Sequence, residues 1–66
     1  MRLSFNGSQI EVPDGTTLLD FVTRKGFNPK VIVVEHNREI VKQEDWGKVA
    51  LNEGDNLQIV TFVGGG

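Results

Sequence analysis

The sequence predicts an α+β domain in which a mixed sheet of four to five strands wraps around one helix. The first supporting observation is the order of the elements along the chain, which is strand, strand, helix, strand, short strand, strand. The second is that a single long helix can cover only one face of one sheet. The third is that a hairpin begins the chain and a long strand ends it, which favours insertion of the last strand beside the first, in the middle of the sheet.

The N-terminal segment shows the alternation of apolar and polar residues that is typical of strands. Two strands are predicted, at about residues 2–6 and 9–13. Between them lies Asn6-Gly7, the strongest short signal of a hairpin, because both residues tolerate the positive φ angles of a type I′ turn. The Pro, Asp and Gly residues at 13–15 then end the second strand.

A helix follows, and its start, its apolar stripe and its end agree with one another. Thr16 or Thr17 can cap the N-terminus, and Asp20 lies where a carboxylate suits the positive end of the helix dipole. Gly26 supplies the left-handed residue that often follows the last helical turn. The residues expected to face the core are Leu18, Leu19 and Val22, with Phe21 beside them.

The second half of the chain alternates short strands with turns. Residues 31–34 are apolar at every position, which suits a strand covered on both faces. A short edge strand is predicted at 39–41, and the final long strand at 57–63. Trp46 is predicted to be a satellite core residue that covers the end of the sheet. The remaining predicted segments are a turn at 36–38, a helical turn at 42–46 closed by Gly47, and a turn at 52–55.

Length and composition narrow the possible function classes. The chain has 66 residues, which allows one domain with a modest core. It contains no Cys, so neither a disulfide framework nor a thiolate metal site is possible. Its net charge of −2 and its scattered Lys and Arg residues argue against a nucleic-acid binder. No apolar run approaches the ~20 residues that span a bilayer, and the N-terminus resembles a strand rather than a signal peptide, so we expect a cytoplasmic protein.

The ionisable residues give little sign of a catalytic or metal site. His36 is the only histidine, and a metal ion needs more ligands at defined spacings, so a solvated turn histidine is expected. Four acidic residues are expected to be turn formers and a solvated surface, which could also meet a basic rim on a partner. They are Glu44, Asp45, Glu53 and Asp55. No catalytic residue and no bound cofactor is therefore predicted, and an enzyme is the weakest hypothesis.

Beyond its last predicted strand the chain continues into Gly64, Gly65 and Gly66. Glycine at an end loses more conformational entropy on ordering than any other residue, so it is a poor structural anchor. A tail without Cβ atoms can instead thread a narrow groove of another protein and bring its carboxylate to a reaction centre. We therefore expect a folded domain at 1–63 and a flexible, solvent-accessible tail at 64–66.

The last predicted strand also offers a surface beside this tail. Because only one face of the sheet belongs to the core, Leu57 and Ile59 are assigned inward, which leaves Val60 and Phe62 on the outer face. An exposed apolar pair next to a reactive end is a reasonable docking patch for a partner. The alternative is that Phe62 folds over the edge of the sheet and is simply half buried.

The predicted layout is that of the β-grasp fold, which is also the fold of ubiquitin. Three segments, 33–41, 53–55 and 59–66, resemble the ThiS family, the sulfur carriers of thiamine biosynthesis. The likeness covers essentially the whole chain, and the combination of length, element order and glycine end is more specific than the glycines alone. The small subunit of molybdopterin synthase is a close relative with the same fold and tail.

The resemblance implies a carrier rather than a catalyst. In that family a ThiF-like adenylating partner, related to the ubiquitin-activating enzymes, uses ATP and magnesium to activate the terminal carboxylate, here that of Gly66. Sulfur that a cysteine desulfurase takes from cysteine then converts the end to a thiocarboxylate, which donates sulfur to a ThiG-like thiazole synthase. Gly64 and Gly65 would thread the partner's groove. The alternatives are molybdopterin synthesis, another sulfur-requiring pathway, and a ubiquitin-like modifier that is joined to lysine.

Overall fold

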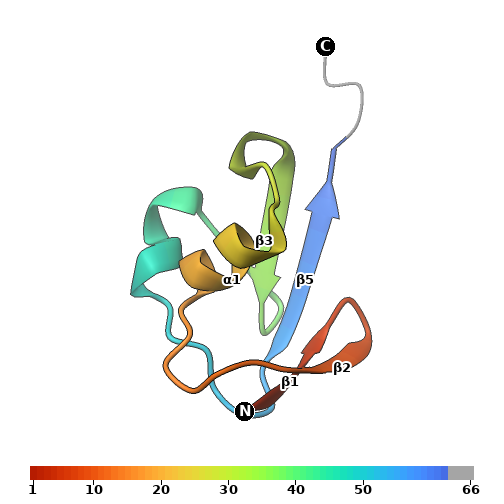
Figure 1. Ribbon diagram of the computed structural model, residues 1–66. Coiled ribbons are helices and arrows are strands. Elements are labelled where there is room, and N and C mark those ends of the chain that lie inside the picture. The colour runs from red at the N-terminus through yellow and green to blue at the C-terminus, as the bar shows by residue number, and fades with distance from the viewer. Residues whose placement is uncertain (63–66) are drawn as a thin grey trace.

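The computed structural model describes residues 1–62, which form a five-stranded sheet and one α-helix. The helix lies beside the sheet (Figure 1). The helix is α1 (Leu18–Lys25), and the two 3₁₀ helices are η1 (Pro29–Val31) and η2 (Gln43–Lys48). The strands are β1 (Arg2–Phe5), β2 (Ser8–Glu11), β3 (Ile32–His36), β4 (Glu39–Val41) and β5 (Asn56–Thr61). The predicted α+β class is confirmed. Residue 63, which was predicted to end the last strand, and the predicted tail at 64–66 lie outside the described residues.

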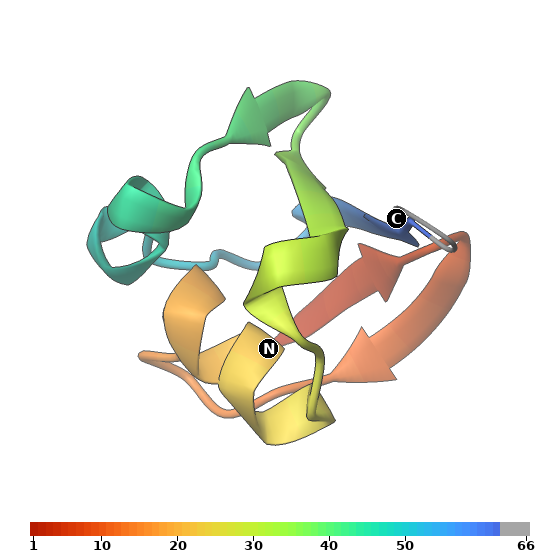
Figure 2. The ribbon, with the colours of Figure 1, turned by 90° about the horizontal axis from the view of Figure 1, so that it is seen from above.

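The sheet has the order β2-β1-β5-β3-β4, so β5 is its central strand. It runs parallel to β1, where Phe5 lies opposite Leu57, and antiparallel to β3, where Val34 lies opposite Ile59. The sheet curves around α1, as the view from above shows (Figure 2). This arrangement confirms the predicted mixed sheet and the predicted insertion of the last strand beside the first.

The predicted hairpin forms with the backbone angles that its turn requires. Asn6 and Gly7 have φ values of 48° and 87°, and Phe5 lies opposite Ser8 across the turn. Both central residues of a type I′ turn need positive φ, and Asn followed by Gly is the pair that adopts it most readily. The hairpin is therefore confirmed, although β1 and β2 each have only four residues.

Helix α1 begins and ends where its capping residues predict. Thr17 Oγ1 accepts a hydrogen bond from the N–H of Asp20 (3.1 Å), and the Asp20 carboxylate accepts one from the N–H of Thr17 (3.2 Å). This reciprocal capping box pairs N–H groups that would otherwise have no partner at the start of a helix. Gly26 follows the last turn with a φ of 77°, in the left-handed region that favours glycine.

Leu19 does not face the core, which corrects the predicted apolar stripe. Its side chain is 45% exposed, whereas Leu18, Phe21 and Val22 are buried. The buried residues share one face by i, i+3 and i+4 spacing, and Leu19 falls at the flank of that face. There it lies beside Gly47 of η2, where an added Cβ would be 3.6 Å from Leu19 Cδ2.

The core is one cluster formed by the sheet, α1 and η2 together with Leu51. Its buried members are Leu3, Leu18, Phe21, Val22, Ile32, Val34, Trp46, Leu51, Leu57 and Ile59. Trp46 is part of this cluster rather than a satellite, and its Nε1–H donates to the carbonyl of Val41 (2.9 Å). The helical turn that carries Trp46 is longer than predicted and contains Gly47 instead of ending there.

Strand β3 is covered on one face rather than on both, which is a further correction. Ile32 and Val34 are buried, but Val33 between them is only half-buried, and Val31 belongs to η1. Successive residues of a strand point to opposite faces, and α1 covers only one of these. The apolar run at 31–34 therefore serves both the core and the outer face.

Candidate functional site

The outer face of β5 carries exposed apolar side chains close to the last described residue. Leu57 and Ile59 are buried, whereas Val60 and Phe62 are 53% and 57% exposed. The alternation of the strand thus places the first pair in the core and the second pair outside, as predicted. The alternative, in which Phe62 folds over the sheet edge, is not supported by this exposure. The docking role of the exposed pair stays a prediction.

Val33 of β3 extends this surface, and the sequence analysis missed it. It lies opposite Val60 in the β3–β5 pairing, and so on the same face. The N–H of Phe62 donates to the carbonyl of Val31 (2.7 Å), the last residue of η1, which keeps Phe62 beside the start of β3. The available signal was the unbroken apolar run at 31–34, which was interpreted as burial on both faces. We call Val33, Val60 and Phe62 the outer apolar patch.

The side chain of Asn6 holds β5 close to its C-terminal end. Its Nδ2 donates to the carbonyl of Ile59 (3.2 Å), and its Oδ1 accepts from the N–H of Ile59 (2.9 Å). The amide group thereby replaces the backbone partner that β1 no longer supplies after Phe5. The sequence identified Asn6 only as a turn residue, because its partner lies 53 positions away and leaves no local signal.

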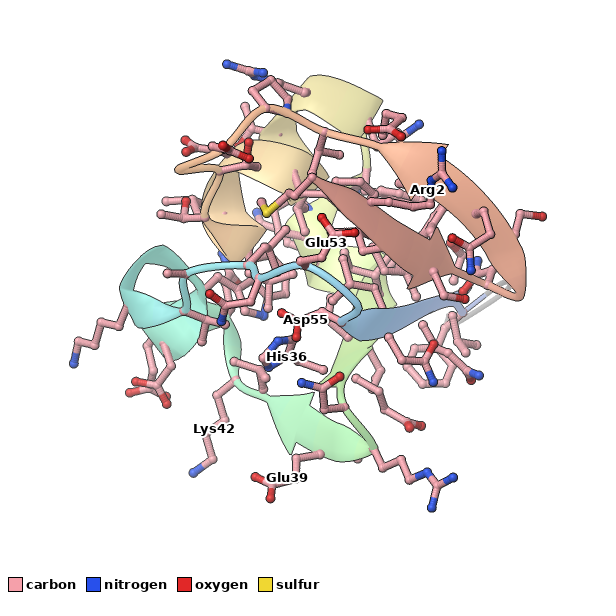
Figure 3. The ribbon with its side chains drawn as sticks, turned by 90° about the horizontal axis from the view of Figure 1, so that it is seen from below. Arg2, His36, Glu39, Lys42, Glu53 and Asp55 are labelled. Atoms are coloured by element: carbon pink, nitrogen blue, oxygen red, sulfur yellow. The ribbon has the colours of Figure 1, made fainter. Side chains whose placement is uncertain are left out.

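A polar cluster joins the β3–β4 turn to the turn before β5, which corrects the prediction that His36 and Asp55 are solvated. His36 Nε2 lies 2.8 Å from Asp55 Oδ2, and the Asn37 side chain donates to Asp55 Oδ1 (3.1 Å). The N–H of Asn52 donates to Asp55 Oδ2 (2.8 Å). The His36 and Asp55 side chains are 19% and 10% exposed, and they lie next to each other between the two turns (Figure 3).

The surroundings of Asp55 change its ionisation. Burial by itself raises the pKa of this carboxyl, but the hydrogen bonds from His36, Asn52 and Asn37 outweigh burial and hold the pKa below its ordinary value. Asp55 is therefore an anion at neutral pH that accepts hydrogen bonds from both turns. Asp55 therefore joins the two turns at the start of β5, and its role in this structure is to stabilise the fold.

The other acidic residues lie at the surface, as predicted. Glu44 is exposed, Asp45 forms an ion pair with Lys48 (3.8 Å), and Glu53 Oε1 accepts from the N–H of Arg2 (2.9 Å). Their part in meeting a partner stays a prediction. Residues 1–62 contain no group of three or more His, Cys, Asp or Glu side chains that could hold a metal ion. In the same part of the chain, no helix has the length and apolar character needed to span a bilayer.

The residues predicted to carry sulfur and to thread a partner's groove are Gly66, Gly65 and Gly64, which lie outside the described residues. Their roles stay predictions. What the described residues provide is the neighbouring surface, since the outer apolar patch includes Phe62, the last of them.

Comparisons with known proteins agree with one another. A family model described as the ThiS family matches residues 3–66. The chain is 35% identical over 65 residues to the sulfur carrier protein ThiS of Bacillus subtilis, a match that covers 97% of this chain and 98% of that protein. It is also 36% identical over 66 residues to a thiazole synthase of Magnetococcus marinus. That match covers 100% of this chain but 20% of the synthase, so the chain spans about a fifth of the length of this relative.

The fold also matches a solved structure. The crystal structure of a thiamine biosynthesis protein (ThiS) from Geobacter metallireducens matches with a TM-score of 0.86 and 25% sequence identity. The match covers 100% of both chains. Together with the strand order observed here, it confirms the predicted β-grasp fold.

Proposed function

Because this chain belongs to the ThiS family, we propose that it carries sulfur for thiamine biosynthesis on the carboxylate of Gly66. The observation that carries the proposal is the family match, which runs from residue 3 to residue 66 and so includes the glycine segment. The similarity to the sulfur carrier of Bacillus subtilis over nearly its whole length supports the proposal further. In this role the protein is a co-substrate on which partner enzymes act.

Transfer of sulfur to Gly66 requires activation of its carboxylate, because a delocalised anion is a poor electrophile and oxide is not a feasible leaving group. A carboxylate oxygen attacks the α-phosphorus of ATP, which releases pyrophosphate and forms an acyl adenylate. The terminal sulfur of a persulfide, formed by the desulfurase, then attacks the acyl carbon and AMP leaves, which gives an acyl disulfide. A second thiol of the partner cleaves the S–S bond, so the thiocarboxylate is released and a disulfide is left on the partner. The adenylating partner supplies magnesium and cationic contacts that stabilise the developing negative charge.

Glycine is suited to all three positions of the segment at 64–66. A side chain at Gly66 would crowd the acyl carbon, and a side chain at Gly64 or Gly65 would obstruct passage through a narrow groove. Three extended residues span roughly 10 Å, so Gly66 can reach a reaction centre below a partner's surface while the domain stays outside.

The proposed partners are a ThiF-like adenylating enzyme, a cysteine desulfurase that provides sulfur, and a ThiG-like thiazole synthase that accepts it, all in the cytoplasm. The similarity of the whole chain to one part of a thiazole synthase supports the last of these. We assign docking to the outer apolar patch, because burial of exposed Val60 and Phe62 would stabilise a complex next to the reacting end.

Intact-mass measurement tests the proposed function. The protein is incubated with a ThiF-like adenylating enzyme, ATP, magnesium and a sulfur source. We expect a product in which one oxygen atom has been replaced by sulfur, and no such product when ATP is omitted or when Gly66 is deleted. An unchanged mass, under conditions that convert the carrier of Bacillus subtilis, would contradict the proposal. A covalent adduct on lysine would instead indicate a ubiquitin-like modifier.

A further inference from the structure

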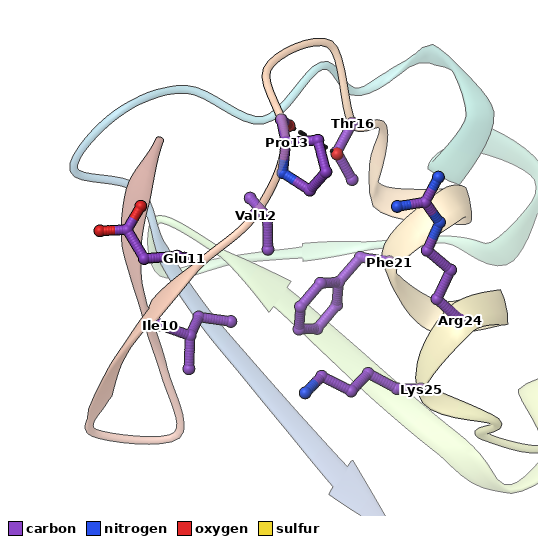
Figure 4. A pocket seen from close by; sticks show the side chains of 8 residues that line it. All are labelled: Ile10, Glu11, Val12, Pro13, Thr16, Phe21, Arg24 and Lys25. Carbon is purple, nitrogen blue, oxygen red and sulfur yellow. Dashed lines mark hydrogen bonds between the residues drawn. The ribbon is translucent and has the colours of Figure 1, made fainter.

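A groove of about 260 Å³ lies between the edge strand β2 and helix α1, away from the outer apolar patch. Ile10 and Val12 lie across the groove from Phe21 of α1, and together they form its apolar floor (Figure 4). Arg24 and Lys25 line its helical side. We call these five residues the β2–α1 groove.

The free edge of β2 forms the other side of the groove. The Met1 ammonium donates to the carbonyl of Val12 (2.8 Å), and the N–H of Val12 donates to the carbonyl of Met1 (2.9 Å). Because hydrogen-bonded pairs alternate along an antiparallel ladder, Gln9 and Glu11 direct their N–H and C=O groups away from β1. Within residues 1–62, β2 ends the sheet and no strand pairs with these groups. Such an edge is a template for a further strand.

The helical side of the groove is cationic. Neither Arg24 nor Lys25 forms an ion pair within residues 1–62. Glu11, which also lines the groove, is already paired with Arg2 (Nε to Oε1, 3.1 Å). The Lys25 ammonium lies 5.7 Å from the centre of the Phe21 ring, so a cation–π contact holds its charge over the apolar floor.

We propose that the β2–α1 groove binds an extended acidic peptide segment of a partner protein, which adds to the sheet as a strand alongside β2. The peptide backbone pairs with the free groups of Gln9 and Glu11. Its aliphatic side chains, at alternate positions, lie over Ile10 and Val12, because successive residues of a strand point to opposite faces. Its flanking carboxylates meet the two cations of the helical side.

The properties of the groove favour this occupant over others. Small-molecule sites typically have volumes of about 300–1,000 Å³, and the groove, at about 260 Å³, is smaller. Only two cations, Arg24 and Lys25, line the groove within residues 1–62, which disfavours nucleic acid, because its binding depends on the neutralisation of several phosphates. The groove instead matches an acidic β-strand in three respects. Its apolar floor suits the aliphatic side chains, the unpaired edge of β2 suits the peptide backbone, and its cationic side suits the carboxylates.

Titration with a synthetic peptide, followed by amide chemical shifts, tests the proposal. The probe has three aliphatic residues at alternate positions, polar residues between them, and two glutamates at each end. We expect saturable shifts at Gln9, Ile10 and Glu11. One control peptide replaces the glutamates with lysines, and another replaces the three aliphatic residues with serines. Both controls should bind at least about tenfold more weakly, because each removes one part of the match.

Charge-reversed variants provide the matched comparison. Arg24→Glu combined with Lys25→Glu should weaken binding by about tenfold or more, because two attractive contacts become repulsive. Lys30→Glu combined with Lys42→Glu makes the same change in net charge at two exposed positions outside the groove. This control should keep the affinity within about twofold, because neither side chain lines the groove and both are exposed to screening by solvent and salt.

A backbone variant tests strand addition separately from charge. Gln9→Pro removes one outward N–H of β2, at an edge position where proline is tolerated. It should bind the probe at least about fivefold more weakly, a loss of about one hydrogen bond, once thermal unfolding has shown that the variant is folded. The proposal is overturned if the probe does not bind, if the shifts centre on Val60 and Phe62, or if the two charge-reversed variants bind equally well.

Discussion

The carboxylate of Asp55 is hydrogen-bonded to His36, to Asn37 and to the N–H of Asn52, and it is nearly buried. The sequence predicted the local turn at 52–55, because Asn, Gly and Asp are turn formers at that spacing. It could not predict the contacts to His36 and Asn37, because these residues lie 19 and 18 positions away and approach only through the register of β3 on β5. Single-residue environments of this kind depend on long-range pairing.

Asp55→Asn should destabilise the fold at neutral pH and reduce its sensitivity to acid. The pKa of Asp55 in the folded state is held below its ordinary value, so its carboxylate contributes to the free energy of unfolding above the unfolded-state pKa of about 3.9. This contribution is lost as the pH falls through the folded-state pKa. Chemical denaturation should show a deficit of about 1–3 kcal/mol for the variant at neutral pH, and a smaller one at about pH 2–3. An equal deficit at both pH values would show that the charge plays no part.

Phe62→Ala should weaken binding to the adenylating enzyme or to thiazole synthase and leave the thermal unfolding transition nearly unchanged. The side chain of Phe62 is 57% exposed, so its removal leaves no cavity in the core. Ile59→Ala is the matched control on the inner face of the same strand, where loss of a buried side chain should cost about 2–5 kcal/mol. Binding and thermal unfolding are measured on both variants. A parallel loss of affinity and stability in Phe62→Ala would assign that residue to the core.

At the scale of elements, the helix and the hairpin were predicted accurately, because the residues that start and end them lie within their own sequences. Thr17, Asp20 and Gly26 define α1 from within its own sequence, and Asn6-Gly7 defines the hairpin. The predictions of burial were wrong where burial depends on which other element packs against a helix or strand. Leu19 is exposed because η2 covers it only in part, and the apolar run of β3 reaches the outer face because no second helix covers that face within residues 1–62.

Asn6→Gly should loosen the end of β5 while leaving the hairpin turn intact. Glycine accepts the positive φ of position 6, but it cannot make the two hydrogen bonds to the backbone of Ile59. We expect a loss of about 1–2 kcal/mol in unfolding free energy and faster amide exchange at Ile59. Arg38→Gly is the matched control, because Arg38 also has positive φ, at 75°. The Arg38 side chain forms no hydrogen bond within residues 1–62, so this control should not speed that exchange. An equal effect of both variants would show that the Asn6 side chain does not hold the end of β5.

At the scale of the whole molecule, one helix covering one face of a five-stranded sheet explains both surfaces of interest. The uncovered face carries the outer apolar patch, and the incomplete cover at the β2 edge leaves the β2–α1 groove. The sequence predicted that the last strand lies beside the first in the middle of the sheet, because of the element order. It also predicted the exposure of Val60 and Phe62, because the alternation along β5 can be read from the chain. It could not predict the groove, whose two sides meet only in the folded molecule.

Tandem mass spectrometry of the C-terminal fragment tests the central claim most directly, because it locates the transferred atom. The protein is first treated with the adenylating enzyme, ATP, magnesium and a sulfur source. Sulfur is expected at the terminal carboxyl group of the fragment that ends in Gly66. Sulfur at any other position, or a fragment that keeps both carboxyl oxygens while the carrier of Bacillus subtilis is converted in parallel, would contradict the claim.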